Sequence, residues 1–110
     1  MAEIRLVVYL DVTGRSAFTR WFDALDPAAA ARISTALYRM GQGNFSNVKG
    51  VGGGVFEYRM DSGPGYRIYF GKDGETLVVL LGGSTKRGQQ PAIQAARDAW
   101  IEYKHRKPRK

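Results

Sequence analysis

The chain of 110 residues has no cysteine and a single histidine, His105. It therefore has no disulfide framework and no thiolate nucleophile, and it lacks the grouped imidazole and thiolate ligands of a zinc site. Neither a Ser–His nor a Cys–His nucleophile is supported, and the carboxylates form no cluster suited to a hard cation. We therefore expect a function that needs neither a metal nor another cofactor.

Long apolar runs are also absent. No stretch approaches the roughly 20 apolar residues of a membrane-spanning helix, and no signal-peptide pattern opens the chain. These two observations favour a cytoplasmic protein with no membrane partner. The length fits one domain, and a hydrophobic content of 44% is enough for a packed core.

Acidic side chains are missing from the last seven residues. The net charge is +7, and residues 104–110 carry five basic side chains and no acidic one, which leaves 12 basic and 10 acidic side chains before them. We expect one domain over residues 1–103 and a basic tail over residues 104–110. Lys104 and Arg106 of this tail are candidate RNA contacts, although many basic ends are only solvated.

The segment of residues 55–70 carries the strongest pattern. Two alternating runs flank a turn of five residues, which predicts a β-hairpin. This register places Arg59 opposite Arg67, so a neighbouring anion is needed, either Glu57 or a bound phosphate. The apolar face consists of Phe56, Tyr58, Met60, Tyr66, Ile68 and Phe70. The polar face consists of Glu57, Arg59, Arg67 and Tyr69.

The first part of the chain predicts a strand and two helices. Residues 3–10 are rich in Ile, Leu, Val and Tyr, which favour a strand. Thr13 is expected to cap a first helix. Its apolar stripe comprises Phe18, Trp21, Phe22 and Leu25. Asp26 and Pro27 are expected to begin a second helix over residues 28–40, which glycines then end.

The rest of the chain predicts a small sheet and a last helix. Residues 41–54 are glycine-rich, and we expect a flexible connection there, since the order of a phosphate-binding P-loop is missing. Residues 77–81 are apolar on both faces and predict a central strand, and Pro91 opens the last helix. The predicted α+β fold is an N-terminal strand, a two-helix hairpin, a three-stranded antiparallel meander and a C-terminal helix.

Fixed cations are the remaining groups that could carry chemistry. They could bind phosphate and stabilise the anion formed when an RNA 2′-hydroxyl attacks its own phosphodiester, a reaction that needs no metal. This set comprises Lys49, Arg59, Arg67, Lys86 and Arg87. Glu57 is either the base or a spacer between arginines, and Tyr69 either stacks on a base or fills space. The mechanism requires Arg67 and Lys86 to reach the same phosphate.

Several segments resemble the toxins of type II toxin–antitoxin modules. The superfamily is RelE/ParE, and the similar branch is that of the HigB-like, phage-derived addiction-module killer proteins. The matching segments are Glu57-Tyr-Arg59, Gly63-Pro-Gly-Tyr-Arg-Ile-Tyr-Phe70 and Leu80-Leu-Gly-Gly83, followed by Lys86 and Gln89. The resemblance covers residues 4–103 and implies a sheet like that of small microbial ribonucleases.

The resemblance implies a metal-independent endoribonuclease that cleaves mRNA, either free or on the ribosome. It also implies a cognate antitoxin, usually an adjacently encoded helix-turn-helix protein, that neutralises the toxin. It assigns Arg67 and Lys86 to the scissile phosphate. The candidate catalytic residues are Arg67, Lys86, Arg59 and Glu57. The candidate RNA-binding residues are Lys49, Tyr69, Arg87, Lys104 and Arg106.

Two other functions stay open. Ribonuclease relatives carry a lysine where Glu57 falls and a late tyrosine where Ile93 or its neighbours stand. These departures favour a ParE-like toxin that binds DNA gyrase and has no nuclease chemistry. The third reading is a non-catalytic RNA-binding module whose basic tail supplies most of the affinity.

Overall fold

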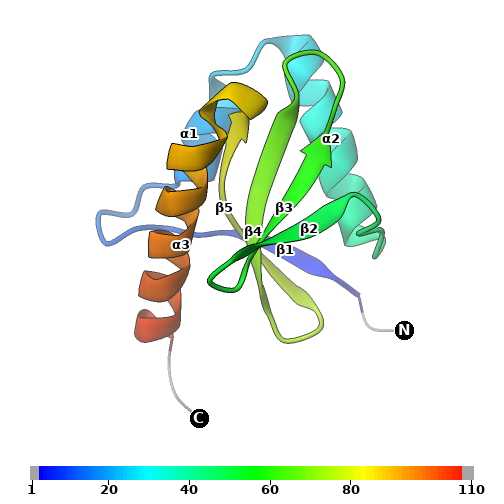
Figure 1. Cartoon of the computed structure of the whole chain (residues 1–110). Coiled ribbons are helices and arrows are strands. Elements are labelled where there is room, and N and C mark those ends of the chain that lie inside the picture. The colour runs from blue at the N-terminus through cyan, green and yellow to red at the C-terminus, as the bar shows by residue number, and fades with distance from the viewer. Residues whose placement is uncertain (1–2, 108–110) are drawn as a thin grey trace.

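Five strands form one mixed sheet, and helices cover both of its faces (Figure 1). This computed structural model describes residues 3–107. The strands are β1 (Arg5–Val8), β2 (Val48–Gly52), β3 (Val55–Met60), β4 (Tyr66–Asp73) and β5 (Leu77–Thr85). The helices are α1 (Ala17–Asp23), α2 (Pro27–Gly41), the 3-10 turn η1 (Lys86–Gly88) and α3 (Gln89–Arg106). The strand order is β1-β5-β4-β3-β2, with β1 parallel to β5 and the other pairs antiparallel.

The predicted α+β order is confirmed, but the predicted number of antiparallel strands, three, is wrong. Four such strands follow α2, because part of the expected flexible connection forms β2. The sequence conceals β2 because two of its five residues are glycines, which disfavour strands. Only Val48 and Val51 tie it to the two cores. Gly52, Gly53 and Gly54 all have positive φ and build the turn into β3.

The predicted hairpin register is confirmed, since Arg59 pairs with Arg67. Its apolar face packs against α1 and α2 and forms the larger of two cores. Ile33 and Met40 of α2 and Phe70 of β4 have no exposed surface. The alternation of side chains therefore fixed which face of the hairpin meets these helices.

The sequence predicted the start of α2 correctly but misplaced the start of α1. Ser16, rather than Thr13, caps α1, because its hydroxyl accepts the Thr19 N–H at 3.0 Å. Thr13 instead donates to Asp11 in the turn that precedes the helix. Asp26 caps α2 as predicted.

Helix α3 lies across the face of the sheet that carries the polar face of the hairpin (Figure 1). Ile93, Ala96 and Trp100 of this helix are buried in a second core. The helix begins at Gln89, two residues before Pro91, directly after η1. Three of the four polar residues of the hairpin, Glu57, Arg67 and Tyr69, therefore lie beneath a helix, and Arg59 remains in solvent.

The basic end of the chain is partly helical. Helix α3 continues through Arg106, so Lys104 and Arg106 are helical residues and not members of an extended tail. Arg106 also forms an ion pair with Glu102 at 2.8 Å. The end of the expected tail, residues 108–110, lies outside the described residues. Across the part that is described, no helix is both long enough and apolar enough to cross a membrane.

Candidate functional site

Three of the predicted site residues lie in a buried polar network between the sheet and α3. Glu57 and Tyr69 have no exposed surface, and Arg67 is 1% exposed. Neighbouring strands bring them together, because Glu57 pairs with Tyr69 and Arg67 pairs with Ser84. The hydroxyls of Tyr69 and Ser84 are 3.0 Å apart and share a hydrogen bond. These groups belong to the protein interior and not to an open surface.

The Glu57 carboxylate offsets the repulsion expected between the two facing arginines. Its Oε1 atom lies 3.6 Å from Nε of Arg59 and 3.9 Å from Nε of Arg67. Its Oε2 atom accepts a hydrogen bond of 2.6 Å from Nε2 of Gln89, the first residue of α3. Of the two anions that the sequence allowed, the protein's own carboxylate occupies this position.

The pairing of Glu57 with Arg67 is incomplete. Glu57 Oε1 and Arg67 Nε are buried and have no hydrogen-bond partner among the described residues, because their separation is too long for such a bond. Arg67 Nη1 donates to the main-chain oxygen of Tyr66 at 3.1 Å and to that of Met60 at 3.4 Å. It also lies 3.6 Å from the Asp61 carboxylate, whose side chain is 86% exposed.

Arg67 cannot touch a phosphate in this arrangement, because its guanidinium is enclosed by protein groups. Arg67 and Lys86 therefore cannot both contact one phosphodiester in this arrangement, contrary to the sequence prediction, because Arg67 is not exposed. Lys86 itself is exposed and lies close by. A Cβ atom on Gly65 would lie 3.1 Å from Lys86 Cβ and 3.7 Å from Arg67 Nη1. The two residues flank Gly65, one in the interior and one at the surface.

Four other predicted cations remain exposed: three lie near the hairpin loop of residues 61–65, and Arg87 follows Lys86 on η1. The N–H of Lys86 on η1 donates to the main chain of that loop. Lys49, expected in a flexible connection, lies instead on β2. With Arg59 and Asp61 it lines a hollow of about 280 Å³. We call the four exposed residues the cationic rim: Lys49, Arg59, Lys86 and Arg87.

The structure separates Lys104 and Arg106 from the cationic rim. At a rise of about 1.5 Å per residue, Lys104 lies about 22 Å along α3 from Gln89. Its Nζ atom is 5.8 Å from the centre of the Trp100 ring. These two residues therefore cannot bind the same phosphate as Lys86, which lies just before the start of that helix.

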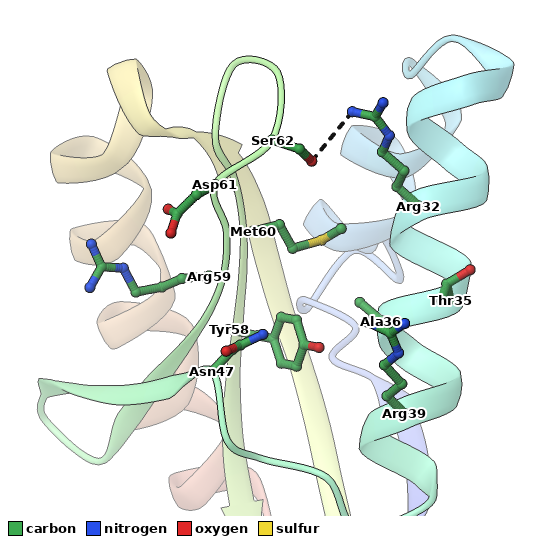
Figure 2. Close-up of a pocket in the computed structure, with 10 residues that line it drawn as sticks. All are labelled: Arg32, Thr35, Ala36, Arg39, Asn47, Tyr58, Arg59, Met60, Asp61 and Ser62. Atoms are coloured by element: carbon green, nitrogen blue, oxygen red, sulfur yellow. Dashed lines mark hydrogen bonds between the residues drawn. The ribbon is translucent and has the colours of Figure 1, made fainter.

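A groove between α2 and the end of β3 contains arginines that the sequence pattern did not single out (Figure 2). Its volume is about 520 Å³. Arg32 and Arg39 stand seven residues apart on the exposed side of α2, and Arg32 donates to the Ser62 hydroxyl at 3.4 Å. Figure 2 shows Met60 pointing toward α2 and Arg59 pointing away from it. The spacing of the two helix arginines was visible in the sequence, but their position beside β3 was not.

Burial controls the chemistry of Tyr69. Its desolvation raises the pKa of the phenol to about 12, against the opposing effect of the hydrogen bond to Ser84. Tyr69 therefore stays protonated at neutral pH, and its enclosed ring fills space rather than stacking on a base. Within residues 3–107, no three His, Asp or Glu side chains are grouped so that they could hold a metal ion.

No family model matches the chain. An uncharacterized protein of Haemophilus influenzae is 38% identical to it over 81 residues, which is 73% of this chain and 82% of the relative. Such identity over most of both chains indicates common descent. The chain therefore belongs to the same family as this Haemophilus influenzae protein.

Proposed function

We propose that the chain is a toxin of a type II toxin–antitoxin module, from the HigB-like branch of the RelE/ParE superfamily. The segment that carries the resemblance builds the hairpin loop and the start of β4, the middle strand of the sheet. The Leu80–Gly83 segment lies on the adjacent strand, and Lys86 follows at its end. The sheet is proposed to be of the kind found in the small microbial ribonucleases.

The proposed target is mRNA, free or on the ribosome, in the cytoplasm. One observation carries this proposal: exposed cations from three separate elements gather around the hairpin loop. Phosphate contacts by lysine and arginine supply most of the affinity of proteins that bind nucleic acid without sequence preference. The cationic rim is therefore the surface expected to hold the RNA backbone.

If this site cleaves RNA, the exposure of its residues changes the roles expected for some of them. Lys86 is the exposed cation at a position that matches the family's phosphate-contacting lysine. Arg67 acts as a positioning residue for the hairpin loop. Its guanidinium contacts Met60 of β3, Tyr66 of β4 and Asp61 of the loop. Glu57 is enclosed, whereas Asp61 is an exposed carboxylate at the rim and becomes the candidate base.

The direct test is cleavage of mRNA by the purified protein in the presence of a chelator, together with transcript mapping after brief expression in cells. We expect new transcript ends, and we expect Lys86→Ala to lose them. Lys104→Ala removes the same charge at the far end of α3 and should leave cleavage unchanged. Growth arrest with intact transcripts would rule out the nuclease.

A second candidate is a ParE-like toxin that binds DNA gyrase. The enclosure of Glu57 and Arg67 favours it, because the arginine that the resemblance assigns to the scissile phosphate is then out of reach of RNA. Induction of the DNA-damage response without loss of RNA, and inhibition of purified gyrase, would select this function. RNA binding with neither cleavage nor toxicity would instead select a non-catalytic RNA-binding module.

Either kind of toxin requires a cognate antitoxin, proposed to be a helix-turn-helix protein encoded beside it. Co-expression with the product of the adjacent reading frame should restore growth. Gel filtration should then recover the two proteins as one complex. Continued arrest with no complex would contradict the antitoxin assignment.

A further inference from the structure

We propose that residues 86–92 form a lid over Glu57 and Arg67, and that this lid opens to expose the Arg67 guanidinium to a phosphate group. The lid comprises η1 and the first residues of α3. In the closed arrangement Arg67 positions the hairpin loop, and in the open one it joins Lys86 at one phosphate. The choice of RNA as the source of that phosphate rests on the proposed function, whereas the opening does not.

The lid buries little apolar surface. Each of its residues is exposed or half-buried, and Ala92 is the one that packs partly against the second core. Buried residues flank the lid on both sides, with Ser84 before it and Ile93 after it. Burial of apolar surface is the main force that holds an element in place, so the lid depends on polar contacts instead.

Two hydrogen bonds join the lid to the hairpin. The Gln89 side chain donates to the Glu57 carboxylate at 2.6 Å, and the Lys86 N–H donates to the main-chain oxygen of Pro64 at 3.3 Å. The second bond is longer than most of its kind. Among residues 3–107, no side chain caps the N-terminus of α3, and its first turn holds no acidic residue. The start of this helix therefore lacks the contacts that usually stabilise one.

The rest of α3 is anchored more strongly, so the lid can open while the remaining helix stays in place. Trp100 is buried in the second core. The Tyr103 hydroxyl donates to the Asp73 carboxylate at 2.8 Å, and the Tyr9 hydroxyl donates to the Glu102 carboxylate at 2.7 Å. These contacts tie the C-terminal half of the helix to β4 and to the segment after β1.

The groups beneath the lid have unused hydrogen-bonding capacity. Glu57 Oε1 and Arg67 Nε are buried and have no hydrogen-bond partner among the described residues. A phosphate oxygen would supply the acceptor that Arg67 Nε lacks, in a charge-assisted bond. Lys86 follows β5 directly, so it stays beside the hairpin loop when the start of α3 moves. A phosphate therefore favours the open form, because it binds Arg67 only there.

A reversible disulfide tests the lid. A Cβ atom on Gly88 would lie 3.8 Å from Ser84 Cβ, which is the usual separation in a disulfide. The chain has no cysteine, so Ser84→Cys/Gly88→Cys forms a single bond that dithiothreitol opens again. The reaction of each arginine with phenylglyoxal is followed by mass spectrometry. We expect Arg67 to react at least about tenfold more slowly in the oxidised form, and Arg59 to react equally in both forms.

Single variants test the lid without a disulfide. Gln89→Ala removes the bond to Glu57 and should speed the reaction of Arg67 about tenfold. Gln90→Ala shortens the same side chain at the exposed neighbour and should change the rate less than about twofold. In the parent, Arg67 should be protected at least about tenfold less than the slowest-exchanging amides of β4, which report global unfolding. Equal reaction of Arg67 in the oxidised and reduced forms, equal effects of the two glutamine variants, or protection of Arg67 equal to that of those amides would each overturn the lid.

RNA binding separates this inference from the proposed function. A fluorescein-labelled RNA of about ten nucleotides, measured by fluorescence anisotropy, should bind the reduced protein at least about tenfold more tightly than the oxidised one. Equal binding to the two forms would overturn the lid and leave RNA as the target. A lock that slows the reaction of Arg67 in a protein without RNA affinity would support the lid and contradict the proposed function.

Discussion

Glu57 and Arg67 form an ion pair inside the protein, with Oε1 and Nε 3.9 Å apart and 0% and 1% of the two residues exposed. Burying two charges is costly, and this pair lacks the direct hydrogen bond that would offset most of the cost. Glu57 gains support from Gln89 and Arg59, and Arg67 gains it from main-chain oxygens. The pair therefore joins β3, β4 and the start of α3.

Arg67→Ala should destabilise the fold, because it leaves the Glu57 charge buried without its partner. We expect a loss of about 3–5 kcal/mol in the free energy of unfolding, measured by urea denaturation. Arg59→Ala removes an arginine whose side chain is 43% exposed and should cost less than about 1 kcal/mol. A loss of activity in Arg67→Ala must be corrected for unfolding before it is assigned to phosphate contact. Stability within about 1 kcal/mol of the parent would contradict the buried pair.

Gln89→Ala should loosen the start of α3. The substitution removes the one side-chain hydrogen bond between the helix and Glu57 and leaves a buried carboxylate oxygen without a donor. We expect a cost of about 1–3 kcal/mol and faster amide hydrogen exchange over residues 86–92. Gln90→Ala changes an exposed neighbour of the same type and serves as the control. Equal exchange in the two variants would show that Gln89 does not hold the helix start.

Gly83→Ala should destabilise the protein where Gly82→Ala does not. A Cβ atom on Gly83 would overlap the ring of Trp21 in α1, whereas one on Gly82 would meet no heavy atom within 4 Å. Forced repacking of this kind costs about 1–3 kcal/mol. Thermal unfolding of both variants would check the difference. A Gly83→Ala variant as stable as the parent would mean that α1 is free to shift outward.

Alkaline pH should destabilise the fold through buried phenols, of which Tyr69 is the most enclosed. An unfolded tyrosine ionises near pH 10, but burial raises the pKa of Tyr69 to about 12. The unfolded state therefore loses its proton first, so the stability due to Tyr69 is complete below pH 10 and is lost as the pH rises to about 12. Tyr69→Phe should make this decline shallower, at a cost of about 0.5–1.5 kcal/mol at neutral pH for the lost Ser84 bond. Tyr38→Phe, at a residue that is 68% exposed, is the control, and an identical decline in both would refute the assignment.

Local pattern was enough to predict the hairpin. Period-two alternation and a turn of five residues determined both the pairing of Arg59 with Arg67 and the face that packs on α2, because a shift by one residue would bury the wrong side chains. The same reasoning missed β2, whose glycines carry no alternation and whose pairing depends on β3. A glycine-rich edge strand is stabilised by its neighbour and leaves little trace in its own residues.

The sequence by itself determined the helix stripes, the hairpin and the set of cations, because each depends on residues a few positions apart. Only the tertiary structure decided which of these cations are exposed. An alternating strand has the same pattern whether its polar face meets water or a helix, so the placement of α3 over Glu57 and Arg67 was not readable from residues 55–70. The groove that joins Arg32 and Arg39 to the end of β3 likewise exists only because packing brings distant segments together.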